Sequence, residues 1–311
     1  MTERRRVFLA NFAGLSLAVA ATIWLGYHVV DRPAPSVSRP GAELANTVTD
    51  SSGHAVPRAD FKHIVSTSLF TDRILVELVT QDRILALSSE STTQVRFTPY
   101  LRSIQTVNAF GPIEALLTMR PDLVLMPSHG TPARAKQLRD AGVAVFELGE
   151  LHGLATLEKT ATVLGDLLGR TLEAKTFLRT IAEERAAVES RRGDRARARG
   201  MYLSIMGSGL QGGTMGTSFH DILALAGVDD VAAIRFSGWP TYTAENVLSL
   251  GPRIIVTREG MAASLCRHPG MEHAPACGPD GNIVELPGNL LDDPGASIVD
   301  AARLLAGTLF P

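Results

Sequence analysis

Cysteine, tyrosine and tryptophan are scarce in this sequence, and neither sign of charge is in excess. Two cysteines in 311 residues are too few for a disulfide scaffold or a cysteine-rich metal site. The 30 Lys and Arg nearly balance the 32 Asp and Glu, so the chain lacks the basic excess that nucleic-acid binding requires. Four Tyr and two Trp also argue against a platform on which bases stack.

Apolar residues, in contrast, are plentiful. The sequence is 45% hydrophobic and 20% charged, which is typical of a globular protein and excludes a disordered or collagenous chain. At roughly 150 residues per domain, the length of 311 predicts about two domains.

The N-terminal thirty residues resemble an export or anchoring segment. An arginine cluster precedes the nearly uncharged run Val7–Val30, which as a helix of ~1.5 Å per residue would cross a ~30 Å hydrocarbon core. Arg5, Arg6, Phe8 and Leu9 match the R-R-x-F-L pattern of a twin-arginine signal. No cysteine follows the run, which excludes a lipoprotein anchor. Residues 1–30 are therefore a cleaved signal peptide or a retained anchor in the inner membrane, and both place the rest of the chain outside the cytoplasm, in the periplasm.

Residues 31–60 have no apolar period and contain four prolines. We expect a flexible linker here.

The body of the chain contains an internal repeat. Residues 113–125 and 244–256 share one plan, in which a helical half with an early glutamate is followed by a proline and an apolar strand. Glu114 corresponds to Glu245, and Pro121 corresponds to Pro252. A weaker match pairs residues 72–82 with 220–230. The repeat predicts two related α/β lobes, an N-terminal lobe at residues 61–153 and a C-terminal lobe at residues 193–311.

Each lobe alternates strands with helices, which predicts parallel sheets covered on both faces. Apolar runs place the strands of the first lobe near 63–67, 83–87, 123–127 and 143–147. The strands of the second lobe are expected near 201–205, 231–235, 253–257 and 282–286.

Residues 154–192 connect the two lobes. They lack proline, and their apolar residues recur at spacings of three and four, which predicts one amphipathic backbone helix of up to ~57 Å. Gly165 and Gly169 allow a bend within it.

An exported chain, two α/β lobes, one connecting helix and the repeated glutamate-helix-proline-strand motif resemble the substrate-binding proteins of ABC importers for ferric siderophores, haem or cobalamin. The resemblance covers residues 60–311. It implies that the chain is not an enzyme and has no resident cofactor. It implies instead that the two lobes capture a metal chelate and deliver it to a permease dimer with its ATPase. Glu114 and Glu245 match the glutamates with which such proteins dock on the permease.

The ligand is expected beyond the carboxyl ends of the strands. The candidate ligand-binding residues in those loops are Ser68, His129, Met206, Trp239, Tyr242 and Arg258. Trp239 and Tyr242 could stack on a flat macrocycle, and His129 could coordinate iron or cobalt. Arg258 could clamp a carboxylate or hydroxamate, although Glu259 beside it could neutralise it instead.

Three further features of the loops leave alternatives open. His152 is a weaker candidate ligand than His129, and His220, within a predicted helix, is expected to be structural. The glycines of residues 207–212 match G-x-G-x-x-G but lack the helix and acidic residue of a dinucleotide site, so we expect a turn. Cys266 and Cys277 could form a disulfide, or the loop between them could bind a metal ion through His268 and His273.

Two other classes of function remain as alternatives. An exported redox or metal-dependent enzyme would suit the export signal, but the sequence contains no nucleophile elbow, H-E-x-x-H motif or cysteine-rich cluster. A receptor for bare zinc or manganese would need about three histidines and a carboxylate at the ligand site, and only His129 and His152 are suitably placed.

Overall fold

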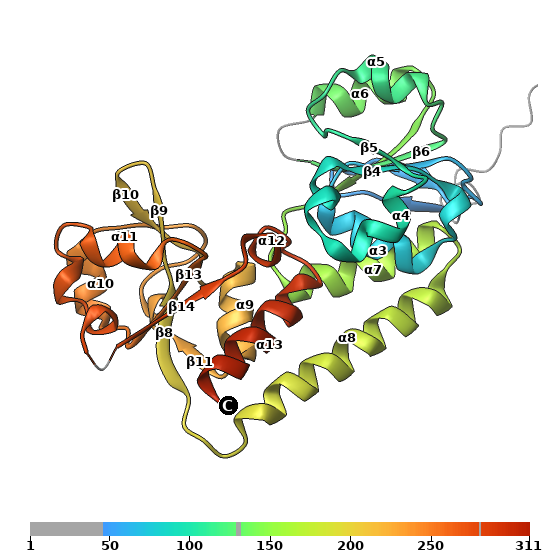
Figure 1. Ribbon diagram of the computed structural model, residues 1–311. Helices are drawn as coiled ribbons and strands as arrows, with labels where there is room; N and C mark the ends of the chain where they lie inside the picture. Colours follow the sequence, from blue (N-terminus) through green and yellow to red (C-terminus); the bar gives the residue numbers. More distant parts are fainter. Residues whose placement is uncertain (1–45, 129–131, 280) are drawn as a thin grey trace, which may run out of the picture. The chain divides into compact units, whose positions relative to one another are not determined.

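The sheet of the N-terminal lobe has five parallel strands, with the order β5-β4-β3-β6-β7 (Figure 1). The strands are β3 (Ile64–Ser66), β4 (Ile84–Ser88), β5 (Gln105–Val107), β6 (Leu123–Pro127) and β7 (Ala144–Leu148). The four strands expected from apolar runs are confirmed. The fifth, β5, escaped prediction because only Val107 of its three residues is buried.

The computed structural model describes Asn46–Ser128, Pro132–Pro279 and Gly281–Pro311, and Thr47–Pro311 form one compact unit. The export-signal residues, the segment 1–30, the first part of the expected linker and His129 lie outside the described residues. Within the described part, no helix has the length and apolar character needed to cross a membrane.

Helices and short helical turns connect the strands of this lobe. The α-helices are α3 (Leu69–Leu78), α4 (Thr98–Leu101), α5 (Ile113–Thr118) and α6 (Pro132–Asp140). The 3-10 turns are η1 (Gln81–Arg83), η2 (Ser89–Thr93) and η3 (Val95–Phe97).

The C-terminal lobe contains a four-stranded parallel sheet with the order β11-β8-β13-β14. Its strands are β8 (Ala198–Tyr202), β11 (Val228–Asp230), β13 (Ile254–Arg258) and β14 (Asn282–Leu286). The prediction of a strand at 231–235 is wrong, because Val231–Ile234 form the 3-10 turn η4. Asp230 ends β11, and its carboxylate accepts a hydrogen bond from the Ala232 amide at 3.1 Å, which starts the turn.

A second, antiparallel sheet with the order β12-β10-β9 belongs to the same lobe. Its strands are β9 (Ser204–Met206), β10 (Gly209–Gln211) and β12 (Thr241–Tyr242). The helices are α9 (Ser218–Leu225), α10 (Ala244–Leu250), α11 (Ala262–Arg267), α12 (Gly288–Leu291) and α13 (Ser297–Leu309), with turns η5 (Met271–His273) and η6 (Pro275–Cys277).

The strand orders confirm that the two lobes repeat one plan. In the N-terminal lobe β3 lies between β4 and β6, and in the C-terminal lobe β8 lies between β11 and β13. The repeated motif is α5 followed by β6 in one lobe and α10 followed by β13 in the other.

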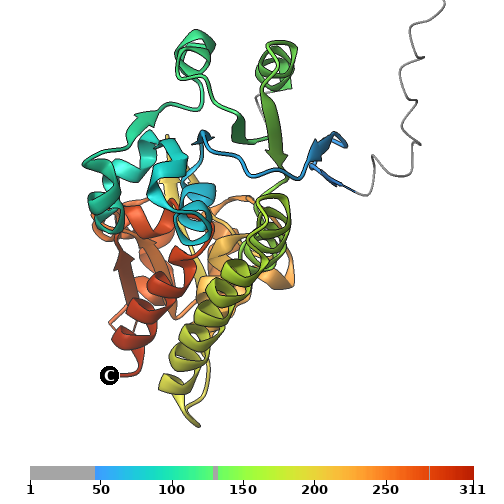
Figure 2. The ribbon, with the colours of Figure 1, turned by 90° about the vertical axis from the view of Figure 1, so that its right-hand side faces the viewer.

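The connection between the lobes consists of two helices, which corrects the expectation of one. These are α7 (Leu154–Leu167) and α8 (Thr171–Arg192), so the predicted ends of the connection are right. Gly169 interrupts it with a φ of 65°, a left-handed conformation that favours glycine and stops the helix. The helices pack side by side (Figure 2), and Arg185 of α8 forms an ion pair with Glu158 of α7 at 2.7 Å.

The last part of the expected linker is also folded. β1 (Thr47–Thr49) and β2 (Ala55–Pro57) form an antiparallel hairpin, and Val48 and Val56 lie in the main hydrophobic cluster. The pair of short strands buries only these two apolar side chains, which is too weak a period to recognise in the sequence.

One hydrophobic cluster joins the inner faces of both lobes to the connecting helices. It contains side chains of α3, α7, α8, α9 and α13, for example Phe70, Leu164, Phe177, Ile222 and Val299. The lobes therefore share a core along α7 and α8.

Candidate ligand-binding site

A pocket of about 430 Å³ lies at the carboxyl ends of β8 and β13, where ligands of parallel α/β sheets bind. Its principal lining side chains are Tyr202, Phe219, Trp239, Met206, Met261, Arg258 and Asp292. Gly212 also lines it, and Gly207 and Ser208 form the turn between β9 and β10, as expected for this glycine-rich segment.

One wall of the pocket is aromatic. The rings of Tyr202 and Phe219 are stacked with centroids 3.7 Å apart, and Trp239 meets Phe219 edge to face at 5.1 Å. Trp239 is 60% exposed although it lines the pocket. Tyr202 and Phe219 are buried, so Trp239 presents most of the accessible aromatic surface of this wall, on which a large ring system can stack.

The polar side of the pocket is an ion pair between Arg258 and Asp292, with Nη1 of Arg258 3.2 Å from a carboxylate oxygen of Asp292. Hydrogen bonds to Asp292 raise the pKa of Arg258 further above its already high value. The neutralising acid is thus Asp292, which is 34 residues away in sequence, and not the neighbouring Glu259.

Two methionines add sulfur to the pocket. Met206 is 70% exposed, and the sulfur of Met261 accepts a hydrogen bond from the Ser204 hydroxyl at 3.3 Å. Thioethers are soft, adaptable groups that pack well against aromatic rings. Of the six predicted ligand residues, Met206, Trp239 and Arg258 therefore meet at one pocket.

Tyr242 does not line this pocket, which corrects its expected role. It lies in β12 and is buried, with its ring edge to face against Phe236 at 5.1 Å. Burial raises the pKa of its phenol above the usual value. The alternation of a strand turns Tyr242 inward, whereas Trp239 lies in the loop before the strand.

The remaining predicted polar residues lie elsewhere. Ser68 precedes α3, and its carbonyl accepts a hydrogen bond from the Thr71 hydroxyl at 3.0 Å. His152 contacts the Gly216 carbonyl at 2.9 Å. His220 is paired with Asp230 at 2.9 Å, which raises its pKa and agrees with the structural role expected for it.

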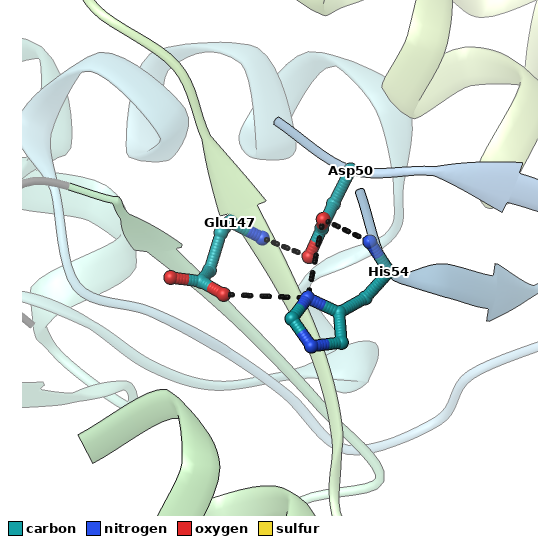
Figure 3. Close-up of side chains that lie close together, drawn as sticks. All are labelled: Asp50, His54 and Glu147. Atoms are coloured by element: carbon teal, nitrogen blue, oxygen red, sulfur yellow. Dashed lines mark hydrogen bonds and ion pairs between the residues drawn. The ribbon is translucent and has the colours of Figure 1, made fainter. Parts of the chain in front are cut away.

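A second pocket of about 450 Å³ lies in the N-terminal lobe, between the β1–β2 hairpin, the end of β7 and α7. At its edge Asp50, His54 and Glu147 come together (Figure 3), with Nδ1 of His54 3.7 Å and 4.0 Å from the two carboxylates. Both carboxylates are buried, and one nitrogen of Arg139 lies 2.8 Å from each of them.

The two carboxylates are already paired with a cation, because the guanidinium of Arg139 forms an ion pair with each of them. Ser51 donates hydrogen bonds from its amide and its hydroxyl to the Glu147 carbonyl, at 3.0 Å and 2.8 Å. The cluster thus fastens the hairpin to β7. Asp50 and His54 went unrecognised in the sequence because they fall in the expected linker, although the polar turn D-S-S-G-H is a hairpin signal.

A buried carboxylate lies at the carboxyl ends of β3 and β4. One oxygen of Asp72 in α3 accepts hydrogen bonds from the Ser88 amide at 3.0 Å and from the hydroxyls of Ser88 and Ser91 at 2.6 Å and 2.5 Å. The other oxygen has no hydrogen-bond partner among the described residues. Burial outweighs the hydrogen bonds and raises the pKa of Asp72 to about 7.

The two repeated glutamates are both exposed, each in the first turn of its helix, Glu114 in α5 and Glu245 in α10. Neither forms an ion pair among the described residues. Thr243 and Asn246 cap α10 reciprocally, which fixes the helix start beside Glu245.

The disulfide between Cys266 and Cys277 is present, with Cα atoms 5.6 Å apart. His268 contacts the carbonyls of Ser208 and Pro269. The loop therefore brings no group of potential metal ligands together among the described residues. In that part of the chain, the side chains close enough to one another to hold a metal ion are those of Asp50, His54 and Glu147.

Known proteins resemble this chain over most of its length. A family profile described as periplasmic binding protein matches residues 64–290. An uncharacterized ABC transporter substrate-binding lipoprotein of Bacillus subtilis, YvrC, is 20% identical over 277 residues, which are 85% of either chain. A cobalamin-binding protein of Halobacterium salinarum is 26% identical over 203 residues, which are 62% of this chain and 54% of that protein.

A solved structure has the same fold. The periplasmic haem-binding protein RhuT from Roseiflexus sp. RS-1, in its apo form, superposes with a TM-score of 0.68 and 20% identity. The superposition covers 80% of this chain and 98% of RhuT.

Proposed function

Since the chain belongs to the periplasmic binding protein family, we propose that it is the extracytoplasmic solute-binding protein of an ABC transporter and captures a metal chelate. The ligand is haem, a corrinoid such as cobalamin, or a ferric siderophore. Relatives named for cobalamin and haem binding support this class of ligand. The metal ion arrives inside the ligand, so the protein needs no resident cofactor and performs no catalytic step.

The aromatic wall of the C-terminal pocket is the observation that supports the proposal most directly. Trp239, Phe219 and Tyr202 form it, and Arg258 supplies a cation beside it. A chelate with a broad apolar ring and anionic side groups can satisfy both sides at once. Met206, and His129 outside the described residues, are further candidates for contacts with the ligand.

Glu114 and Glu245 provide the proposed contact with the permease. Each is exposed on a helix start of an equivalent motif, one in each lobe. Two carboxylates on repeated supports suit the arginines of a two-fold permease dimer, which its ATPase drives. A retained segment 7–30 would tether the protein to the inner membrane, whereas a cleaved one would leave it free in the periplasm.

Binding of candidate chelates to the full chain tests the proposal. The Trp24→Phe variant leaves Trp239 as the single tryptophan, because the sequence has two. Haemin, cyanocobalamin and a ferric hydroxamate are titrated separately, and quenching of Trp239 and visible spectra are measured. We expect one of the three to bind at micromolar or lower concentration.

The matched variants locate the ligand. Trp239→Ala, measured by the visible spectra of the chelate, should weaken binding about tenfold, because a stacked aromatic contact is lost. Leu172→Ala removes another exposed apolar side chain, from α8, and should leave the affinity unchanged. Failure of all three chelates to bind would show the proposed ligand class to be wrong.

A further inference from the structure

The guanidinium of Arg258 is held by an acid that lines the same pocket but comes from a different segment of the lobe. Both terminal nitrogens of Arg258, at the end of β13, bond to the carboxylate of Asp292, just after α12. An anionic group that enters the pocket therefore competes with Asp292 for this cation.

Asp292 is fixed in place by its neighbours. Leu291 before it and Asp293 after it are both buried, and Asp293 accepts a hydrogen bond from the Gly295 amide at 2.8 Å. The backbone at Asp292 is thus held from both sides. Arg258 is the mobile partner, since its long side chain can turn without any movement of β13.

The position of Arg258 depends on the absence of a side chain at Gly288. A Cβ atom at Gly288 would lie 1.9 Å from Nη1 of Arg258, so the guanidinium packs where any other residue would place a side chain. The clashing atom is the far end of a flexible side chain. A methyl group at this position would therefore move Arg258 and leave the backbone where it is.

Separation of the pair is easy. The side chains of Arg258 and Asp292 are 36% and 57% exposed, and exposed ion pairs contribute little to stability. Once released, Asp292 remains in contact with water, so its carboxylate is not left buried without a partner.

We propose that Asp292 is an internal competitor for anionic ligands, which occupies Arg258 until a carboxylate or similar group of the ligand replaces it. Asp292 therefore biases the pocket toward ligands that carry a full negative charge beside their apolar ring, because such a charge exchanges with the Asp292 carboxylate more readily than a neutral polar group does. This inference rests on the proposed function only in taking the pocket as the ligand site.

Paired probes test the competition in the full chain. Haemin carries two carboxylates, and haemin dimethyl ester carries the same ring without them. Asp292→Asn should bind haemin roughly three- to tenfold tighter and the ester within about twofold of the unchanged protein. Gly288→Ala should shift haemin binding in the same direction with no change in charge. Asp300→Asn removes an acid of α13 that does not line the pocket and should have no effect.

A second probe separates this inference from the identity of the chelate. Anilinonaphthalene sulfonate, an apolar anion, is titrated against the unchanged protein, Asp292→Asn and Arg258→Gln. Tighter binding to Asp292→Asn and weaker binding to Arg258→Gln support the competition even if haemin does not bind. The inference is overturned if sulfonate affinity is independent of Arg258, or if Asp292→Asn weakens haemin and ester binding alike.

Discussion

The two lobes share a strand order but place different chemistry at the carboxyl ends of equivalent strands. In the N-terminal lobe, β3 ends in Ser66, close to the buried Asp72, and β6 ends in Pro127. In the C-terminal lobe, β8 ends in Tyr202 and β13 in Arg258, which line the candidate ligand pocket. The repeated scaffold therefore fixes where a site can form, and the residues at the strand ends decide what the site does.

A feature that both lobes retain is an aspartate in the first turn of an equivalent helix. Asp72 of α3 accepts a hydrogen bond from the Ser88 amide at 3.0 Å, and Asp221 of α9 accepts one from the Leu154 amide at 2.7 Å. Burial raises the pKa of both carboxyls. Each carboxyl group thus connects its helix to a neighbouring segment by a hydrogen bond, although burial disfavours its charged form.

The largest expected effect on stability is in the N-terminal lobe, where Arg139 joins two buried acids. Arg139→Ala should lower the free energy of unfolding by about 3–5 kcal/mol, because Asp50 and Glu147 lose their shared cation. Urea unfolding measures the loss. Lys136→Ala on the same helix breaks an exposed pair with Asp140 and should cost under about 1 kcal/mol. Equal losses of stability in the two variants would contradict the role of Arg139 in holding the β1–β2 hairpin to β7.

The next effect depends on pH and concerns Asp72. Its pKa of about 7 lies above the ordinary 3.8, so the folded protein retains a proton that the unfolded chain has released. The free energy of unfolding should therefore fall as the pH rises from about 4 to 7, by at most about 4 kcal/mol from this group. Denaturant unfolding of the unchanged protein and of Asp72→Asn at several pH values measures this contribution as the difference between their slopes.

Asp82→Asn is the control for that experiment, since Asp82 is exposed in the same lobe and its pKa is lowered. Its contribution has the opposite sign. An Asp72→Asn variant whose stability follows the same pH curve as the unchanged protein would show that folding does not raise the pKa of Asp72.

The smallest effect on stability is expected at the positions where the lobes are most alike. Glu114→Ala and Glu245→Ala should each change the free energy of unfolding by under about 1 kcal/mol, the size of a helix-end charge effect. Together they should abolish uptake of the ligand by cells and leave its affinity within twofold.

Uptake by the single variants then compares the lobes directly. Similar losses indicate equivalent docking contacts, and loss in one variant alone shows that the lobes divide the task unequally. Glu183→Ala on α8 should import normally.

The parts of the fold that sequence patterns predicted are those with continuous apolar runs. The strands β6, β13 and β14 are examples, and so are the ends of the connection at Leu154 and Arg192. The glycines at 165 and 169 also indicated where the connection could bend, and it breaks at Gly169. The hairpin β1–β2 and the strand β5 depend on two or three residues each. Tertiary contacts determine such short elements, so local periodicity does not reveal them.

The candidate site was predictable to a similar extent. Loops after strands located Trp239 and Arg258, but the inward turn of Tyr242 depends on a two-residue strand. The partners of these residues were missed because they come from distant segments. The apolar pattern of the helix that contains Phe219 predicts only burial in the core, and Asp292 lies 34 residues after Arg258.

The doubled connection between the lobes has a mechanical consequence. Two helices that pack together along their length, as α7 and α8 do, resist bending more than they would separately. Bending the pair would require one helix to slide past the other. Contacts of α8 with α3 in one lobe and with α9 and α13 in the other oppose such sliding at both ends. The packing of α7 and α8 therefore favours a stiff connection between the lobes, and we expect ligand exchange at the candidate pocket to involve loops and side chains more than movement of the lobes.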